Sequence, residues 1–315
     1  MKTIRDITIS GKRVFIRVDF NVPLDKQQQI TDDSRIRAAL PTIAYAREKG
    51  AKLILASHLG RPKGKPAAEF SLSPVARRLG DLLDADVKMA EDCVGGAVAH
   101  LISGIQPGDV TLLENLRFHS QEQENDDAFA QSLAALCDVY INDAFAVSHR
   151  ANASVVAITK FAPTSGAGFL LEKEINYIKK AMADPRRPLA AVVGGAKVSS
   201  KLAALHNMLQ HVDTVIVGGA MANTFLKFMG YAVGQSKIEE DLVAAAGDVI
   251  KKASEKGVRF YLPVDLVVAP EPDVKAPAKI VPAQEIPTDW MALDIGPATA
   301  LLFREALQDA RTVVW

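Results

Sequence analysis

The chain has very little cysteine, no excess of charge of either sign and no long apolar run. Its two cysteines, Cys93 and Cys137, have neither the CxxC spacing of a redox or zinc motif nor the density of a disulfide-rich secreted domain, so reduced thiols in a cytoplasm are expected. Lys plus Arg and Asp plus Glu are each 37, which argues against a chain-wide nucleic-acid or membrane-surface role. Charges interrupt residues 1–20, and no later run stays apolar for the width of a bilayer, so neither export nor a membrane span is predicted.

What is present indicates a folded α/β protein. Hydrophobic residues make up 49% of the 315 residues, and this length exceeds that at which one core usually stops growing, so two domains are expected. Short β-branched runs, each followed by a polar turn and an amphipathic stretch, occur in two series: 14–18, 52–57, 110–113 and 139–142, then 189–193, 214–217, 260–264 and 312–314. This alternation is typical of βα units and predicts two Rossmann-like parallel-sheet domains, each with three α/β/α layers.

A connecting helix is predicted between the two series. Five apolar side chains lie there at helical spacing: Leu170, Leu171, Ile175, Ile178 and Met182. We therefore expect an N-terminal domain over 1–168, a hinge helix over 169–183 and a C-terminal domain over 184–315, although an ordinary peripheral helix would show the same spacing. The stretch 269–287 is expected to be an extended surface excursion. Because the final RTVVW opens a strand, we expect the chain to be a truncated product.

Polar side chains follow each strand run of the first domain. Ligands of an open parallel sheet bind beyond the carboxyl ends of its strands, so these residues are the candidate site. They come from four connections and the first helix: Asp19 and Asn21, His58 and Arg61, Glu114, Asn115 and Arg117, Asp143, His149 and Arg150, and Arg35. Guanidinium groups offer bidentate forks to phosphate and carboxylate, so their convergence predicts a site for a small metabolite carrying both groups.

Each of these residues also has a simpler interpretation. A single arginine is most often a solvated surface residue, and Asp19 and Asn21 could merely form a turn. His58 could cap a helix or border the core. A metal site of His58, His119 and His149 is an alternative, but no HxH or HExxH spacing supports it.

The second domain carries two glycine turns suited to a nucleotide. In VVGGAKVSSK, at 192–201, a strand leads through a Gly-Gly pair into a predicted helix, on which Lys197 and Lys201 are four apart and share a face. Two ammonium groups on one face favour a polyphosphate between them, whereas the glycine pair alone would indicate only a tight turn. The second pair, at 217–225, lacks lysines and suits a base or ribose, and Leu262 and Leu293 could line an apolar slot or be plain core.

These features favour phosphoryl transfer between a nucleotide and an anionic metabolite over two rivals. A nicotinamide-dependent dehydrogenase would need a glycine-rich first turn, and the first turn here, DFNVP, has no glycine. A non-catalytic binding module remains the alternative from a different class, and assays of turnover would separate it from an enzyme.

Five segments, in this order, resemble the signature segments of phosphoglycerate kinase: RVDFNVP at 17–23, SHLGRP at 57–62, ENLRF at 114–118, NDAFAVSHR at 142–150 and GGAKVSSK at 194–201. The resemblance covers essentially the whole chain. It implies reversible phosphoryl transfer between ATP and the carboxylate of 3-phosphoglycerate, giving 1,3-bisphosphoglycerate and ADP, in a glycolytic, cytoplasmic and monomeric enzyme that uses Mg²⁺ with its nucleotide. It implies no nucleic-acid or membrane partner.

The resemblance also implies roles for individual residues. It places phosphoglycerate on residues of the first domain: Asp19, Phe20, Asn21, Arg35, His58, Leu59, Gly60, Arg61, Arg117 and Arg150. It places the nucleotide on residues of the second: Gly195, Ala196, Lys197, Lys201, Gly218, Gly219 and Leu293. Arg35 and Lys197 would be catalytic. The family continues past VVW into NGPxGxFE and GGGD[ST] segments, so no metal ligand is assignable in this chain.

Overall fold

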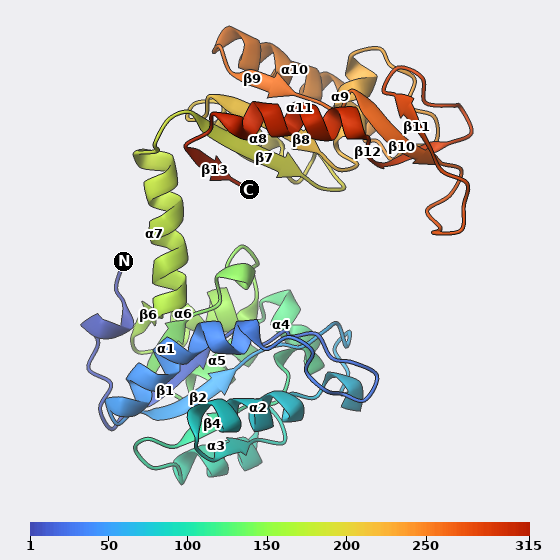
Figure 1. Cartoon of the computed structure of the whole chain (residues 1–315). Coiled ribbons are helices and arrows are strands. Elements are labelled where there is room, and N and C mark those ends of the chain that lie inside the picture. The colour runs from blue at the N-terminus through green and yellow to red at the C-terminus, as the bar shows by residue number, and fades with distance from the viewer. The chain divides into compact units, whose positions relative to one another are not determined.

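Residues 1–315 are described by a computed structural model that divides into two compact units, Met1–Tyr177 and Ile178–Trp315 (Figure 1). The division falls inside helix α7 (Phe169–Ala183), which has the bounds expected for the connecting helix. No helix in the structure combines the length and the apolar character needed to cross a bilayer.

The first unit is built on six parallel strands in the order β3-β4-β2-β1-β5-β6. Their bounds are β1 (Arg13–Arg17), β2 (Lys52–Ala56), β3 (Val87–Met89), β4 (Val110–Leu112), β5 (Val139–Asn142) and β6 (Ser165–Ala167). The four runs expected in this unit are all strands, to within one residue at each end. The short edge strands β3 and β6 were not predicted, because three residues carry too little pattern to be recognised.

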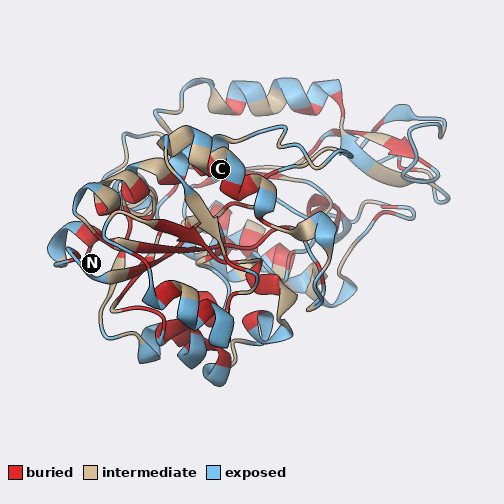
Figure 2. Ribbon diagram, turned by 90° about the horizontal axis from the view of Figure 1, so that it is seen from below, coloured by how far each residue is buried: buried red, intermediate tan, exposed pale blue.

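Successive side chains along these strands point to opposite faces of the sheet, and the helices packed on both faces produce the three expected layers. Val14 and Ile16 of β1 pack into one buried cluster with α1 (Ser34–Glu48) and α2 (Ser73–Leu83), whereas Phe15, between them, packs into another with α3 (Gly96–Ser103) and α5 (Asp127–Ala134). Figure 2 shows buried residues on the strands and exposed residues on the outward faces of the helices. Each fully buried aliphatic side chain contributes about 1.5–3 kcal/mol, so both faces must be covered.

The second unit contains a four-stranded parallel sheet and a smaller antiparallel one. The parallel sheet has the order β13-β7-β8-β9, with β7 (Leu189–Gly194), β8 (Thr214–Gly218), β9 (Arg259–Tyr261) and β13 (Thr312–Val314). Its core includes side chains of α8 (Leu202–Met208), α9 (Ala222–Phe228) and α10 (Val243–Glu255). Both units are thus α/β, as predicted.

The antiparallel sheet, in the order β11-β10-β12, was not expected. It comprises β10 (Asp265–Ala269), β11 (Lys279–Pro282) and β12 (Met291–Ile295). Strand β11 lies within the stretch 269–287, which was expected to be an extended surface excursion and in which no strand was predicted. Proline-rich flanks and a single buried side chain, Val281, concealed a strand that sits at the sheet edge, where proline is tolerated.

The remaining elements complete the two units. They are η1 (Ile4–Asp6), η2 (Ala68–Phe70), η3 (Leu116–Phe118), α4 (Ser120–Glu124), η4 (Phe145–Val147), η5 (Ala153–Ala157), α6 (Ile158–Phe161), η6 (Glu240–Leu242) and α11 (Pro297–Gln308). Of these, η3, α4 and η5 bear on the site of the first unit, because they carry an arginine and a buried charge network described below.

Candidate functional site

A pocket of about 210 Å³ lies at the carboxyl ends of the strands in the first unit. The structure brings together there eight residues named from the sequence: Asp19, Asn21, Arg35, His58, Gly60, Arg61, Arg117 and Arg150. Ala146 and Val147, which sequence reasoning missed, also line it. They lack polar groups, so only their place in the segment before Arg150 could have indicated them.

Arg35 enters this pocket from the first turn of α1. Its Nη1 lies 2.7 Å from Asp19 Oδ2, and the two side chains are 47% and 10% exposed. Asp19 follows β1 directly, so the ion pair joins a strand end to the helix after it. An exposed pair of this kind stabilises a fold by at most about 1 kcal/mol, so its main effect is to orient the guanidinium.

His58 is buried beside the same aspartate but is neutral. Burial, reinforced by the nearby arginines, lowers the pKa of His58 to about 2. Its Nδ1 lies 3.2 Å from Arg17 Nη2, and since arginine can only donate, Nδ1 must accept and Nε2 must carry the hydrogen. The 3.9 Å separation of His58 Nδ1 from Asp19 Oδ1 is therefore not an ion pair.

Arg117 is held by the backbone of the glycine turn after β2. Its Nη1 donates to the Gly60 carbonyl at 2.8 Å, while the Gly60 N–H donates to Asn21 Oδ1 at 2.8 Å. Burial and the neighbouring Arg150 lower the pKa of Arg117. Gly60 has φ +61°, and a Cβ there would lie 2.4 Å from the Phe70 ring, so only glycine fits this turn.

A buried network behind the pocket was missed from the sequence. Arg17, the last residue of β1, is 2% exposed and donates from Nε to Ser154 Oγ at 2.9 Å. Ser154 in turn donates from Oγ to Glu122 Oε1 at 2.6 Å and from its backbone N–H to Oε2 at 2.9 Å. Burial raises the pKa of Glu122, and the charge of Arg17 opposes that shift. The serine thus bridges Arg17 and Glu122, and Arg17 in turn contacts His58 of the pocket.

Several predicted polar residues serve the fold rather than the pocket. Asn115 accepts from Leu59 N–H at 3.2 Å and donates to the Leu59 carbonyl at 2.7 Å, which fixes the turn that ends in Gly60. Glu114 accepts from the Leu72 N–H at 2.8 Å, at the residue that precedes α2. His149 is exposed and accepts from Arg150 Nε at 3.3 Å.

Asp143, also named from the sequence, caps the helix at which the two units divide. Its Oδ1 accepts from the backbone N–H groups of Leu170 and Leu171 at 2.8 and 3.1 Å. Asp143 is fully buried, its Oδ2 has no hydrogen-bond partner, and burial raises its pKa to about 6. The carboxyl group therefore satisfies the N-terminus of α7 and does not line the pocket.

Phe20 and Leu59 have buried side chains within the core cluster of α1 and α2. The Phe20 N–H donates to Ser57 Oγ at 2.8 Å. With their side chains enclosed, these two residues could meet a ligand only through their backbone.

In the second unit, two glycine pairs lie at the ends of neighbouring strands. Gly194 pairs with Gly218, and the Gly195 carbonyl accepts from the Met221 N–H at 2.9 Å. A Cβ on Gly219, whose φ is +66°, would lie 2.8 Å from the Gly195 nitrogen. Glycine is required there because the two turns touch through their backbones.

The expectation that Lys197 and Lys201 share a helix face was wrong. Residues 195–201 form turns, and α8 begins only at Leu202 with Lys201 as its N-cap. Within these turns, the Ser199 N–H and Oγ both donate to Glu239, at 3.0 and 2.7 Å. Both lysines are nevertheless exposed. Lys201 Cε lies 3.8 Å from the position of a Cβ on Gly195, which places its chain over the turn.

The two leucines suggested for an apolar slot lie in different surroundings. Leu262 packs between two core clusters and lines an apolar pocket of about 450 Å³ together with residues such as Met229 and Tyr261. Leu293, on β12, is 44% exposed and does not line that pocket. The structure therefore does not bring these two side chains into one slot.

Comparison with known proteins decides the family. The sequence profile described as phosphoglycerate kinase matches residues 4–315. The chain belongs to the phosphoglycerate kinase family. The phosphoglycerate kinase of Desulfosudis oleivorans is 60% identical over 315 residues, which is all of this chain and 80% of that protein. That of Geobacter metallireducens is 58% identical over 308 residues, covering 98% of this chain and 77% of the relative.

Solved phosphoglycerate kinase structures agree with the fold. The Coxiella burnetii enzyme superposes with a TM-score of 0.77 at 41% identity, over 99% of this chain and 79% of that one. The Pyrococcus horikoshii enzyme gives a TM-score of 0.81 at 31% identity, over 99% and 80% of the two chains. The resemblance drawn from the five signature segments is thereby confirmed.

Proposed function

We propose that this phosphoglycerate kinase family member transfers a phosphoryl group reversibly between ATP and the carboxylate of 3-phosphoglycerate, and that the pocket of the first unit holds the phosphoglycerate. The single observation that carries the proposal is the charge of that pocket. The pocket contains four arginines but only one carboxylate, that of Asp19, and His58 adds no charge. The arginines are Arg35, Arg61, Arg117 and Arg150. 3-Phosphoglycerate carries close to three negative charges near neutral pH, from its phosphate and carboxylate, and so matches this excess.

The neutral state of His58 supports binding rather than proton transfer. A general base works best with a pKa near the operating pH, and the pKa of His58 lies far below it. The reaction needs no base, because the nucleophile is a carboxylate that is already ionised. His58 Nε2–H can instead donate to a ligand oxygen, and Asp19, Asn21 and Arg35 can orient the ligand's hydroxyl and charged groups.

For the nucleotide we propose the glycine turns of the second unit. Lys201, over Gly195, would meet the phosphates, and Lys197 would stabilise the phosphoryl group in transfer. The nucleotide would lie against the backbone of the two small-residue turns, which comprise Gly195, Ala196, Gly218 and Gly219. Leu293 would make an apolar contact with it. Catalysis would then consist of positioning two anions in line and neutralising the charge that passes between them.

Mg²⁺ enters this proposal with the nucleotide. When bound, it neutralises charge on the phosphate oxygens. Glu239, the carboxylate that contacts the turn at 195–201, already accepts two hydrogen bonds from Ser199. The turn itself supplies backbone N–H groups and the ammonium groups of its lysines. These donors suit phosphate and not a cation, so we assign no protein ligand to Mg²⁺ and no step to it.

Direct transfer requires the two ligands to approach each other, so we place the accompanying hinge in α7, where the two units divide. We assign 1–168 to phosphoglycerate, 169–183 to the hinge and 184–315 to the nucleotide. We further propose that the protein works as a cytoplasmic monomer, which accords with two buried, unpaired cysteines and a balanced charge.

Trapping the acyl phosphate tests the proposed reaction. The protein, incubated with Mg-ATP, 3-phosphoglycerate and hydroxylamine, should form a hydroxamate, whereas glycerate in place of 3-phosphoglycerate should form none, since it lacks the phosphate that the arginines hold. Calorimetric titration with 3-phosphoglycerate alone tests the pocket separately. A hydroxamate yield that is equal with glycerate, or undiminished in Arg117→Ala, would refute the assignment.

A further inference from the structure

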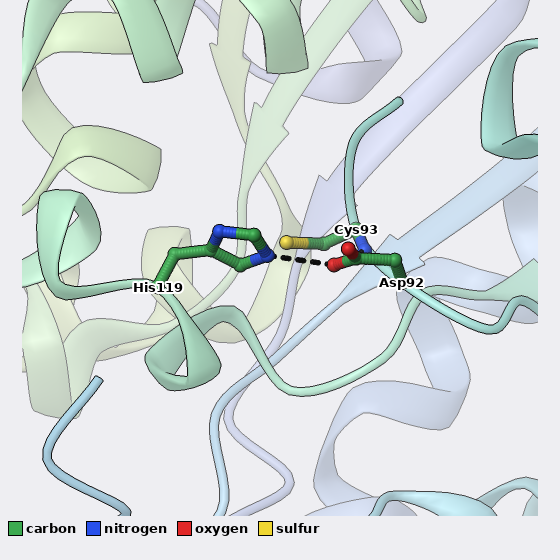
Figure 3. A group of neighbouring side chains, drawn as sticks. All are labelled: Asp92, Cys93 and His119. Carbon is green, nitrogen blue, oxygen red and sulfur yellow. Dashed lines mark hydrogen bonds and ion pairs between the residues drawn. The ribbon is translucent and has the colours of Figure 1, made fainter. Parts of the chain in front are cut away.

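A group of three potential metal ligands lies outside the proposed phosphoglycerate site. Asp92, Cys93 and His119 each offer one ligand atom, and these atoms all lie within 4.8 Å of one another. Figure 3 shows the three side chains pointing toward one another, with the Cys93 sulfur and an Asp92 oxygen both near the same imidazole nitrogen. Sequence reasoning had considered His119 only with two other histidines, and the structure places it with an aspartate and a cysteine instead.

The convergence on one nitrogen distinguishes this group from a nucleophilic triad. His119 Nε2 lies 2.7 Å from Asp92 Oδ1. A histidine that activated the thiol would use one ring nitrogen for the sulfur and the other for the carboxylate. In Figure 3 both partners lie on the Nε2 side of the imidazole, so a cation placed among the three ligand atoms would face all of them once the Asp92–His119 hydrogen bond opens.

From these contacts we propose that Asp92, Cys93 and His119 form a zinc site, with water as the fourth ligand. Thiolate, imidazole and carboxylate are the ligand types that zinc takes, whereas Mg²⁺ and Ca²⁺ take oxygen ligands alone. Tetrahedral zinc holds such atoms roughly 3.3–3.5 Å apart. The Asp92–His119 contact, now 2.7 Å, must therefore lengthen by less than about 1 Å, and any ligand distance longer than this spacing must shorten.

Burial and access also suit a bound ion. Cys93 is fully buried, while the His119 and Asp92 side chains are 26% and 48% exposed, so one side of the group is open to solvent. That side borders a pocket of about 430 Å³, also lined by Glu91 and Glu114. The His119 ring stacks on Phe129 with centroids 5.2 Å apart, which fixes its plane. The ion would thus have a rigid inner wall and an entry path.

Such a site would join two loops of the first unit. Asp92 and Cys93 lie between β3 and α3, and His119 directly follows η3, which carries Arg117. Zinc would therefore clamp the segment that supplies one of the pocket arginines, at a place where the ion itself touches no proposed substrate ligand. This role is separate from that of Mg²⁺ in the reaction.

Zinc titration of the tag-free, reduced protein, followed by calorimetry, tests the proposal without any assay of activity. We expect one Zn²⁺ per chain. Loss of a partner that merely supports a ligand typically weakens metal affinity 10- to 100-fold, so Cys93→Ala, His119→Gln and Asp92→Asn should each weaken it by roughly 100-fold or more. The matched controls are Cys137→Ala, which alters the other buried cysteine, and His100→Gln, which alters an exposed histidine on α3. Both should bind Zn²⁺ as the parent protein does.

Cobalt substitution reports on the ligands directly. Co²⁺ bound at this site should show the intense visible bands of a tetrahedral complex and a thiolate-to-metal charge-transfer band that Cys93→Ala abolishes. Circular dichroism verifies that each variant folds, and Asp92→Asn, which keeps the side-chain size, provides the measurement if His119→Gln is unstable. Absence of Zn²⁺ binding in the parent protein, unchanged affinity in Cys93→Ala and Asp92→Asn, or a cobalt spectrum without the thiolate band would each overturn the proposal.

Discussion

Replacing Arg35 by alanine separates ligand binding from folding better than replacing Arg117, another arginine of the pocket, does. Its guanidinium is nearly half exposed and pairs with Asp19, so its removal should lower the free energy of unfolding by at most about 1 kcal/mol. Arg117, by contrast, is buried and bonded to the Gly60 carbonyl, so its removal would alter the pocket and the fold together. A change in phosphoglycerate affinity caused by Arg35→Ala can therefore be attributed to the ligand.

The size of the effect follows from the chemistry of the contact. A hydrogen bond between charged partners contributes about 1.5–3 kcal/mol, which corresponds to roughly 10- to 150-fold in Kd. The substitution also leaves the Asp19 carboxylate, which is 10% exposed, without its partner and facing an anionic ligand. This repulsion acts in the same direction, so the upper part of the range is expected. Affinity for ADP, which we assign to the second unit, should be nearly unchanged.

Arg37 provides the matched control on the same helix. It is 53% exposed and pairs with Asp33 at 2.9 Å, as Arg35 pairs with Asp19, but it does not line the pocket. Calorimetric titration of Arg35→Ala and Arg37→Ala with 3-phosphoglycerate and with ADP measures the effect on ligand affinity. Thermal unfolding of the same variants measures the effect on stability. Equal losses of phosphoglycerate affinity in the two variants would show a general charge effect, and an unchanged affinity in Arg35→Ala would refute the assignment of the pocket.

Three further predictions concern the other parts of the molecule. In steady-state assays with ATP, Lys197→Ala should lower kcat roughly 100-fold with little change in KM, whereas Lys201→Ala should raise KM at least as visibly, and near-normal kcat in the first variant would contradict its assigned role. Because burial raises the pKa of Asp143 to about 6, the stability it contributes is present at low pH and lost as the pH rises through 6. In urea unfolding between about pH 4 and 7, the free energy of unfolding of the wild type should fall by up to about 3 kcal/mol more than that of Asp143→Asn. If the free energies of unfolding of the two proteins changed in parallel with pH, this prediction would be wrong. Gly219→Ala forces a Cβ to 2.8 Å from the Gly195 nitrogen, so Tm and ADP affinity should both fall, which thermal unfolding and titration would detect.

The pocket could be predicted because its residues follow strands that the sequence pattern reveals. Once the runs at 14–18, 52–57, 110–113 and 139–142 are taken as parallel strands, the next residues of each must meet at one edge of the sheet. The buried network behind the pocket could not be found in this way. Arg17 lies inside a run that counts as apolar, and Ser154 is 137 positions further along the chain. Only the fold reveals that Ser154 joins Arg17 to Glu122.

The nucleotide turn shows a different limit of sequence patterns. A spacing of four places two lysines on one face only if the backbone between them is helical, and a Gly-Gly pair does not determine where the helix begins. In the structure residues 195–201 form turns, and Ser199 there donates to Glu239, 40 positions further along the chain, a contact that the local spacing does not reveal. Lys197 and Lys201 stay predicted phosphate ligands, because both are exposed beside the glycine turn whether or not that turn is helical.

The buried charges also bear on how readily the proposed anion would bind in the pocket. Arg117 loses hydration on burial and is repelled by Arg150, which together lower its pKa, so the fold holds this charge at a cost in free energy. A neutral His58 limits that cost, because a protonated imidazole beside Arg17 would add one more positive charge. An anion of the kind we propose would offset the repulsion that remains. Its binding is therefore favoured both by the hydrogen bonds it accepts and by the relief of charge already confined there, which is the advantage of a preorganised site.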